Sequence, residues 1–596
     1  MLCTQCGQQF EYFTGEVESY DKLGVLRPLN CQECRQRRRL AFRNEKNLYH
    51  NKSYKSGRQM ISTYPASSPF RIIDQDEWWD DGSDATIYGR DFDFNRPFFE
   101  QFKELQKDVP RWSRMFVNCE NSDFTNNSAN IKNGYLSFSS YNSEDIFYCM
   151  RTFGLFDCVD CLNVKDSQHC SECADCKKCH NVHYSQLSEG CSDSYFLYDC
   201  KGCTNCILSA QIRNKEFVFL NKQYGKEQYE SLKKEFFAKL FQNKNQILKM
   251  FDDLRKNALH KNMRLLNAEN SLGDFINDSR NILNGFYIVD SQDCINVFDS
   301  SGLKDCHDCC ALDDESELCI ECDTTYKLYN CKFCTYSGNS SNTLYSDQCF
   351  FIDDCFGCIG LRKRKYSILN KVYSKDEYVQ MIAKITEHMK ATGEYGQPFP
   401  ISCSSYPYNI TVAHQFYPLE KSVALGLGCM WHEEENSAQH FGQKYEISSD
   451  LSLIDESICN KILVCEKTGK NYKIIPQEFK FYKKFGLPIP RVCPDQRYKD
   501  MLKLQPPKKL ADTKCFVCGT DMKTVYPREF GYKVVCEGCY LKEVYGIENY
   551  RITELQKIDC RLEISGFDFF CNSPYNATKL LAPSHAKLKI AVWDLA

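Results

Sequence analysis

Residues 149–206 read CMRTFGLFDCVDCLNVKDSQHCSECADCKKCHNVHYSQLSEGCSDSYFLYDCKGCTNC, and all eleven cysteines of this stretch lie on one frame of three residues. Followed from Gly134 to Ile212, the same frame otherwise holds only Gly, Ser, Thr, Val, Leu and Ile, and no charged residue. A period of three fits neither the 3.6 residues of an α-helical turn nor the two-residue alternation of an ordinary strand. The frame therefore predicts a narrow β-solenoid with small side chains pointing inward.

Many of these cysteines are twelve residues apart, as Cys149, Cys161 and Cys173 are. Twelve-residue coils with small inward side chains resemble the cysteine-rich β-helices of insect antifreeze proteins, in spacing only, because the Thr-x-Thr rows of that family are absent. Two alternatives stay open. The run from Cys158 to Cys173 also reads as C-x2-C-x8-C-x2-C, a zinc-knuckle spacing, and coils stacked about 4.8 Å apart would allow disulfides. Because Ser, Val, Leu and Ile share the frame, we expect mostly reduced, metal-free thiols.

The central part of the chain is duplicated. GLFDCVDC at 154–161 recurs as GLKDCHDC at 302–309, and CSEC at 170–173 recurs as CIEC at 319–322, with a one-residue slip of the frame after Leu312. A repeat of this kind predicts two tandem units. We expect each unit to end in a helix that closes the open coil edge. The first helix is predicted from about residue 226 to about 263, and a capping box at 374–377 opens the second.

The two ends of the chain are also copies of each other. At an offset of 462 residues the ends align without a gap, and the coincidences include Cys3/Cys465, Gly7/Gly469, Glu16/Glu478, Tyr20/Tyr482, Cys31/Cys493, Arg35/Arg497, Gly57/Gly519 and Tyr64/Tyr526. The chain therefore begins and ends with the same module.

Each copy of the module keeps four cysteines that the other has lost in whole or in part. The retained quartets are Cys3, Cys6, Cys31 and Cys34 in the first copy, and Cys515, Cys518, Cys536 and Cys539 in the second. Paired C-x2-C knuckles suit Zn²⁺, and four thiolates leave no open position for water or substrate. We expect two structural Zn²⁺ ions per chain.

The positions that correspond to the missing quartets are poor in zinc ligands. They are Ser53, Ser56, Asp74 and Glu77 in the first copy, and Cys465, Thr468, Cys493 and Gln496 in the second. Hydroxyl, amide and carboxylate oxygens do not match the softer ligands that zinc prefers. We expect these half-sites to be metal-free.

Composition limits the class of protein. The chain has 596 residues, 38 cysteines and a net charge of -4, which argues against a globally basic nucleic-acid binder. The knuckles begin at Cys3, which leaves no room for a signal peptide, and no apolar run reaches the roughly 18 residues of a membrane span. We therefore expect a cytoplasmic protein in a reducing compartment, with no membrane partner.

Residues 3–35 carry C-x2-C, Thr14-Gly15-Glu16, Tyr20 and C-x2-C-R, and they resemble the treble-clef zinc-binding domain known from uncharacterised microbial proteins. The whole layout, including YGRDFDF at 88–94, is similar to large cysteine-rich proteins of environmental bacterial genomes. This resemblance extends to about Tyr545. It implies a zinc-binding fold and supplies no activity.

Together these patterns predict a mainly β, multidomain protein, with treble-clef and zinc-ribbon modules at both ends that flank two tandem cysteine-rich β-solenoid repeats with capping helices. The expected divisions are a zinc module at 1–73, an acidic and aromatic linker at 74–117, solenoid repeats with helices at 118–267 and 268–397, a connector at 398–457, a second zinc module at 458–545 and a tail at 546–596.

Three classes of function compete. The closed zinc sites and the repeats favour a non-enzymatic scaffold or interaction protein with a protein partner or a larger assembly. Nucleic-acid binding is the alternative, because a basic stripe follows Cys34 and could track a phosphate backbone; it comprises Arg35, Arg37, Arg38, Arg39, Arg43 and Lys46. An enzyme is least favoured, since the chain has no H-E-x-x-H, P-loop, G-x-S-x-G or G-x-G-x-x-G motif.

Overall fold

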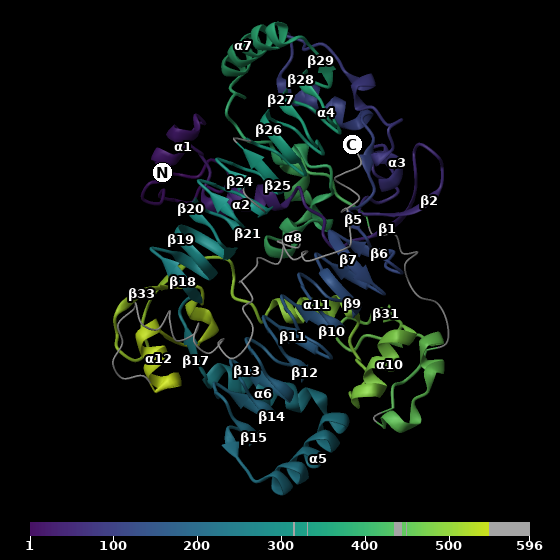
Figure 1. Ribbon diagram of the computed structural model, residues 1–596, viewed down its shortest axis with the longest axis vertical. Coiled ribbons are helices and arrows are strands. Elements are labelled where there is room, and N and C mark those ends of the chain that lie inside the picture. Colours follow the sequence, from purple (N-terminus) through teal and green to yellow (C-terminus); the bar gives the residue numbers. More distant parts are fainter. Residues whose placement is uncertain (314–315, 330–331, 434–443, 449, 547–596) are drawn as a thin grey trace, which may run out of the picture.

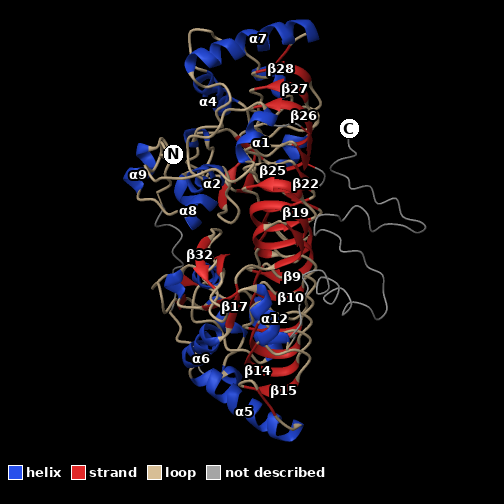
Figure 2. Cartoon of the chain, turned by 90° about the vertical axis from the view of Figure 1, so that its left-hand side faces the viewer, coloured by secondary structure: helices blue, strands red, loops and turns tan. Residues whose placement is uncertain are grey.

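The computed structural model describes residues 1–313, 316–329, 332–433, 444–448 and 450–546, so nearly all of the expected tail lies outside the described residues. The protein is mainly β with several sheets, as expected, and its helices lie around two long series of strands (Figures 1 and 2). We call these series stack 1 (residues 116–223) and stack 2 (residues 265–372). No helix in the described part of the chain is long and apolar enough to cross a membrane.

Stack 1 is built from parallel strands that pair at a twelve-residue offset, with an antiparallel pair at its end. Val159 pairs with Ser171, and Cys161 with Cys173. Its strands are β5 (Phe116–Val117), β6 (Phe124–Asn126), β7 (Ser128–Lys132), β8 (Tyr135–Phe138), β9 (Tyr141–Phe147), β10 (Phe156–Leu162), β11 (Ser171–Ala174), β12 (His180–His183), β13 (Ser192–Tyr198), β14 (Thr204–Ala210), β15 (Glu216–Phe219) and β16 (Lys222–Gln223).

The cysteines of the frame of three are buried inside stack 1. Cys161 and Cys173 are fully buried, and the Cys161 Sγ donates to the backbone oxygen of Cys170, nine residues further along, at 3.7 Å. A narrow interior of this kind accepts small side chains and satisfies each thiol with a backbone carbonyl of the next coil. The interior position of these cysteines agrees with the sequence prediction.

Stack 2 has the same construction with two irregularities, the first of which is at its start, where Leu265 pairs with Ile276 at an offset of eleven. Arg280 pairs with Gln292 at an offset of twelve, whereas Leu303 pairs with Ser316 at an offset of thirteen, which places the one-residue slip seen in the sequence. Its strands are β18 (Leu265–Glu269), β19 (Leu272–Val289), β20 (Gln292–Ile295), β21 (Phe298–Ser301), β22 (Leu303–Lys304), β23 (Cys310–Asp313), β24 (Ser316–Glu317), β25 (Asp323–Tyr329), β26 (Gly338–Leu344), β27 (Asp353–Phe356), β28 (Lys365–Ile368) and β29 (Lys371–Val372).

The residue before most inward positions has a left-handed backbone. Asp157, Asp160 and Asn163 have φ angles of 49°, 51° and 54°, and the pattern repeats along most of both stacks. Asn and Asp tolerate this region better than other residues with a Cβ. The Asn, Asp and Gly residues that precede the inward frame are therefore a second signal of this fold in the sequence.

The two stacks run in opposite directions from the middle of the molecule. In Figure 1, stack 1 descends from β5 to β15 and stack 2 rises from β18 to β28, and Figure 2 shows β9 to β15 below β19 to β28. Helix α7 (Lys375–Thr392) closes the upper end, and its capping box at Ser374 and Glu377 is confirmed. The lower end carries two helices, α5 (Lys226–Gln242) and α6 (Lys244–Asn257), instead of the single helix expected. The Asn243 side chain accepts a hydrogen bond from the Gln246 N–H and so caps α6.

The aromatic linker lies on stack 2. Helices α3 (Gln75–Trp79) and α4 (Phe98–Asp108) supply half of its aromatic rings. The ring of Phe98 lies 5.0 Å from that of Phe356, and the ring of Trp79 lies 5.2 Å from that of Phe350. This N-terminal segment therefore covers the far half of stack 2 before the chain returns to begin stack 1.

Candidate metal centres

The first cysteine quartet lies in the helical half of the N-terminal module, residues 1–48. Cys3 and Cys6 occupy a turn, Cys31 caps helix α2 (Gln32–Leu40), and Cys34 lies in its first turn. The four sulfur atoms all lie within 4.8 Å of one another. The sulfurs of Cys6 and Cys31 are 3.8 Å apart.

The second quartet lies in the hairpin half of the C-terminal module, residues 511–545. Cys515 and Cys518 lie in the turn between β32 (Ala511–Lys514) and β33 (Asp521–Thr524). Cys536 caps helix α12 (Glu537–Tyr545) and Cys539 follows on it. These four sulfurs also lie within 4.8 Å of one another, and those of Cys518 and Cys536 are 3.8 Å apart.

Both quartets have dimensions that can hold a metal ion. In a tetrahedron with metal–sulfur bonds of about 2.3 Å, the sulfurs are about 3.8 Å apart. The 3.8 Å contacts at the two sites match this value. Among the described residues, these are the two places where three or more His, Cys, Asp or Glu side chains could hold one metal ion.

Glycine shapes the turn at each site. Gly7 has φ +71° and Gly519 has φ +72°. Gly7 N–H donates to the Cys3 oxygen, and Gly519 N–H donates to the Cys515 oxygen, both at 2.9 Å. A residue with a Cβ would be strained in this left-handed conformation. Glycine thus lets the chain turn directly after the second cysteine of each pair, so that both thiols face one point.

Each site also contains a thiol that ionises readily. Burial acts to raise the pKa of Cys3, but backbone N–H groups of Cys31, Cys6 and Gln5 donate to its sulfur and lower that pKa to about 6. At the second site the Thr520 hydroxyl and N–H lower the pKa of Cys518 to about 6. The thiolate is the form that binds metal.

In the N-terminal module, hydrogen bonds and an ion pair occupy the position of the missing quartet. The Ser53 hydroxyl donates to the Glu77 carboxylate. Asp74 accepts from the Asp76 N–H to cap α3 and pairs with Arg58 at 3.2 Å. The four oxygen-bearing side chains are therefore engaged in polar contacts that hold this turn together without requiring a metal.

In the C-terminal module, the position of the missing quartet keeps two sulfurs. Thr468 Oγ1 lies 3.9 Å from the Cys493 Sγ, near Cys465. Gln496 instead donates to Asp500 at 3.0 Å. The amide is thus engaged with its own helix, α11 (Pro494–Leu502).

The predicted basic stripe is not an exposed surface. Arg35, Arg39 and Arg43 are 1%, 3% and 4% exposed. The six cations of the stripe have these partners: Arg35 pairs with Glu16 and Asp308, Arg38 and Arg39 with Glu321, Arg43 with Glu45, and Lys46 with Asp495, while Arg37 donates to the Cys34 sulfur. An exposed stripe at these positions is not what the structure has, because most of these cations meet acidic side chains inside the molecule; nucleic-acid binding itself stays a prediction.

Two of these buried contacts are repeated in the other copy of the module. Arg35 reaches Glu16 of its own module and Asp308 of stack 2, both at 2.7 Å. In the equivalent position, Arg497 reaches Glu478 at 3.0 Å and Asp160 of stack 1 at 2.8 Å. The helical half of each module therefore docks on a stack through the same three residues. The N-terminal copy docks on stack 2 and the C-terminal copy on stack 1.

An exposed ion pair repeats in the same way. Lys22 of α1 (Glu16–Leu23) pairs with Asp305 at 2.8 Å, and Lys484 of α10 (Pro476–Phe485) pairs with Asp157 at 2.6 Å. Lys22 and Lys484 are 462 residues apart, and Asp157 and Asp305 are 148 apart, as in the two sequence duplications. The docking geometry was therefore duplicated together with the residues that make it.

The hairpin half of each module pairs with the strand that leads into the opposite stack. Strand β3 (Ile72–Ile73) pairs with β4 (Arg111–Trp112), just before stack 1, whereas β34 (Lys533–Val535) pairs with β17 (Leu259–Lys261), just before stack 2. Each module thus bridges both stacks. The first quartet lies beside stack 2, because helix α2 docks there. Helix α12 of the second quartet contacts stack 1, where the Tyr540 hydroxyl donates to Asp199 and accepts from Arg213.

The acidic residues that receive the arginines are not among the site residues predicted from the sequence. Asp160 and Asp308 stand at the same place in GLFDCVDC and GLKDCHDC, and Glu16 and Glu478 coincide in the module alignment. These coincidences were visible, but nothing in the sequence showed which module meets which repeat.

Comparisons with known proteins supply no assignment. No protein-family model matches the chain, and no curated protein matches it. Among solved structures, a proposed acetyltransferase from Desulfovibrio desulfuricans G20 aligns with 9% identity over 48% of this chain and 81% of that chain, with a TM-score of 0.09. This likeness is too low to support a common fold. The resemblance to treble-clef proteins rests on the residues of the sequence alone.

Proposed function

We propose that this protein is a non-enzymatic zinc-binding scaffold that presents a rigid surface to a macromolecular partner. The observation that carries the proposal is the closure of both cysteine quartets, each within a module that is fastened to a stack. A group of four thiolates with sulfurs about 3.8 Å apart suits tetrahedral Zn²⁺ and leaves no open ligand position. Zinc at these sites would hold structure rather than perform chemistry.

We further propose that the stacks are two β-solenoid repeats and that the terminal modules are treble-clef and zinc-ribbon units from one duplicated ancestor. The twelve-residue parallel register and the buried inward cysteines support the first part. The repeated contacts of Arg35 and Arg497 support the second. Repeats that stack through strand pairing and are joined by modules at their sides form an extended structure, as expected of a scaffold.

Two surface hollows are found among the described residues. One is lined by Phe94, Ala383, Lys384 and Glu387, and another by residues of the segments 51–54 and 66–72. Neither brings a histidine or a cysteine to the surface. The buried basic stripe favours a protein partner over nucleic acid. The many buried thiols fit a reducing, cytoplasm-like compartment.

The test is to isolate the full chain from its native source, measure its metals, and identify what accompanies it before and after nuclease treatment. We expect two equivalents of zinc and protein partners that nuclease does not release. Nucleic acid as the sole companion, or turnover of a small molecule by the isolated chain, would overturn the scaffold proposal.

A further inference from the structure

The two joints between a helical half and a stack have equivalent residues but different charge. The joint of the N-terminal module on stack 2 is balanced. Its three acids and three cations, all buried or nearly so, are Glu16, Asp308 and Glu321 with Arg35, Arg38 and Arg39. Asp308 receives two guanidinium groups, from Arg35 at 2.7 Å and from Arg39 at 3.1 Å, together with the hydroxyl of Tyr20.

The joint of the C-terminal module on stack 1 lacks one cation. The positions of Arg38 and Arg39 are Asp500 and Met501 in this copy. The acids equivalent to those above are Asp160, Glu478 and Glu172, and the cations that meet them are Arg497, at 2.8 Å from Asp160 and 3.0 Å from Glu478, and Lys244 of α6, at 2.7 Å from Glu172. Three acids therefore share two cations.

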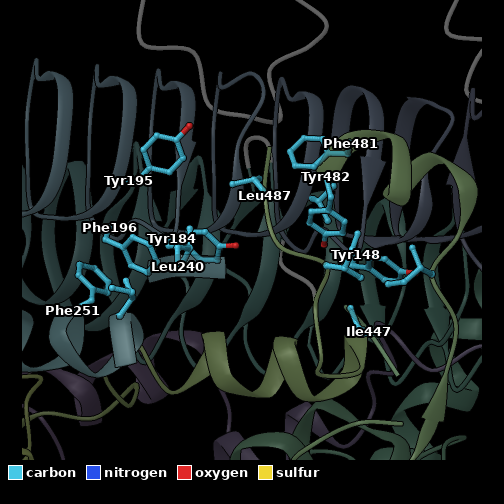
Figure 3. Packing of buried hydrophobic residues seen from close by; sticks show 14 of the residues in the cluster. Tyr148, Tyr184, Tyr195, Phe196, Leu240, Phe251, Ile447, Phe481, Tyr482 and Leu487 are labelled. Carbon is cyan, nitrogen blue, oxygen red and sulfur yellow. The ribbon is translucent and has the colours of Figure 1, made fainter. Parts of the chain in front are cut away.

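The missing cation leaves Asp160 poorly neutralised. Its side chain is about 1% exposed, and Arg497 Nε is its one cationic contact among the described residues. Arg497 also serves Glu478, to which the hydroxyls of Tyr148 and Tyr482 donate at 3.2 and 3.3 Å. Figure 3 shows Tyr148 and Tyr482 side by side in this core. In the part of the chain that the structure describes, no tyrosine donates to Asp160 as Tyr20 does to Asp308.

From this difference we propose that the joint between the C-terminal module and stack 1 is a pH-sensitive contact. It is closed when Asp160 is protonated, and it loosens as the pH rises through neutrality. The equivalent joint on stack 2 carries a balanced set of charges and does not respond in this range. A buried carboxylate without a full counter-charge is costly, so the folded joint retains a proton that the open joint releases.

The protonation behaviour of the two aspartates agrees with the charge count. Burial raises the pKa of Asp160 to about 7, although Arg497 acts in the opposite direction. Burial acts on Asp308 as well, but Arg35 and Arg39 lower its pKa below the usual value. Burial raises the pKa of both Glu16 and Glu478, so the difference between the joints lies in the aspartates. Because the pKa of Asp160 is raised on folding, its contribution to stability falls as the pH rises from about 4 to about 7.

Other ionisable groups also lie near this joint. Asp157 meets Lys484 at 2.6 Å and His169 at 3.2 Å, at the solvent-exposed edge. His183 packs near Phe481 of α10, and burial lowers the pKa of this imidazole to about 3, so it stays neutral from pH 6 to 8. Asp500 pairs with Lys467 at 2.6 Å, away from Asp160.

The test is hydrogen exchange of the full zinc-loaded chain at pH 6 and pH 8, with uptake corrected for the intrinsic pH dependence of exchange. We expect α10 and α11 to open about tenfold more at pH 8 than at pH 6. We expect no such change in α1 and α2, which serve as the internal control.

Two variants test the cause. In Asp160→Asn the proton is no longer needed, so the tenfold change should disappear and α10 and α11 should stay protected at both pH values. Met501→Arg restores the cation that Arg39 provides in the other joint, and it should also abolish the change, which keeps the test available if Asp160→Asn fails to fold. The proposal is overturned if α1 and α2 respond as α10 and α11 do, if protection is higher at pH 8, or if the tenfold change persists in a folded variant.

Discussion

Arg151 and Asp299 occupy equivalent positions of the two stacks, 148 residues apart, and they pair with each other at 3.2 Å between Nη1 and Oδ2. A contact between equivalent residues lies on the axis that relates two copies. In a dimer of identical chains such a residue would meet its own copy. Here the copies lie in one chain, so one position holds a cation and the other an anion. The molecule is thus a pseudo-two-fold assembly of two halves, with this ion pair at its centre.

This pair should contribute to stability in a pH-dependent way. Burial alone would raise the pKa of Asp299, but Arg151 and Lys508 lower it to about 2. A carboxyl whose pKa is depressed on folding stabilises the fold above its unfolded pKa of about 3.9, and that contribution is lost as the pH falls toward 2. We expect Asp299→Asn to lower the free energy of opening of the central coils by about 2 to 3 kcal/mol at pH 6.

Hydrogen exchange of the central coils at pH 6, 4 and 3 would measure this effect. The difference between the variant and the natural chain should shrink below pH 4, and zinc loss in acid affects both proteins alike. Asp290→Asn, at an exposed left-handed position of the same stack, is the matched control and should change nothing. A difference that stays constant from pH 6 to 3 would contradict the role assigned to the Asp299 charge.

Metal content should follow the retained quartets. Cys34→Ser and Cys536→Ser should each reduce zinc from two equivalents to one, and each should unfold its own module half, because structural zinc contributes about 10 to 16 kcal/mol in small finger peptides. Cys493 is equivalent to Cys31 but lies in the module half that lacks a complete quartet. Cys493→Ser should therefore leave both zinc ions in place. Elemental analysis of the purified chains decides; three or more equivalents in the natural chain would point to metal inside the stacks.

The frame of three should separate tolerated from damaging substitutions. Cys173 is fully buried, whereas Lys177, in the same coil, is only partly buried. An arginine at 173 would place a charge in a narrow interior without a partner, at a cost of several kcal/mol. Lys177→Arg should be neutral. Thermal denaturation and soluble yield compare the two chains, and equal behaviour would remove the argument for an inward frame.

The arginines after Cys34 should act in the joint and not in nucleic-acid binding. Arg39→Glu would bring a third acid to Asp308 and Glu321 and should destabilise the N-terminal joint by about 3 to 5 kcal/mol. Limited proteolysis after α2 would detect this opening. Lys55→Glu, at a half-exposed site of the same module, is the control. Loss of bound nucleic acid from a variant that keeps an intact joint would contradict this assignment.

Short-range patterns in the sequence predict the cysteine quartets and the inward direction of the cysteines in stack 1. The C-x2-C spacing is sufficient to bring four thiols together, because each pair lies in one short turn or at the start of one helix, and so both quartets were correctly placed. The frame of three likewise predicted that Cys161 and Cys173 point inward, because a side chain's direction within a coil depends on its nearest neighbours in the sequence.

What the sequence could not give is which surfaces meet. Arg35 and Arg39 read as a solvent-exposed basic stripe, since their partners Asp308 and Glu321 are more than 270 residues away. Whether such an arginine lies in water or in a buried ion pair depends on which stack its module docks on. The sequence near the arginine is compatible with both outcomes. The sequence therefore determined the coil, the turns and the thiol quartets. Only the tertiary structure decided that the N-terminal helical half docks on stack 2 and that Asp160 shares one arginine with Glu478, because those facts follow from long-range packing.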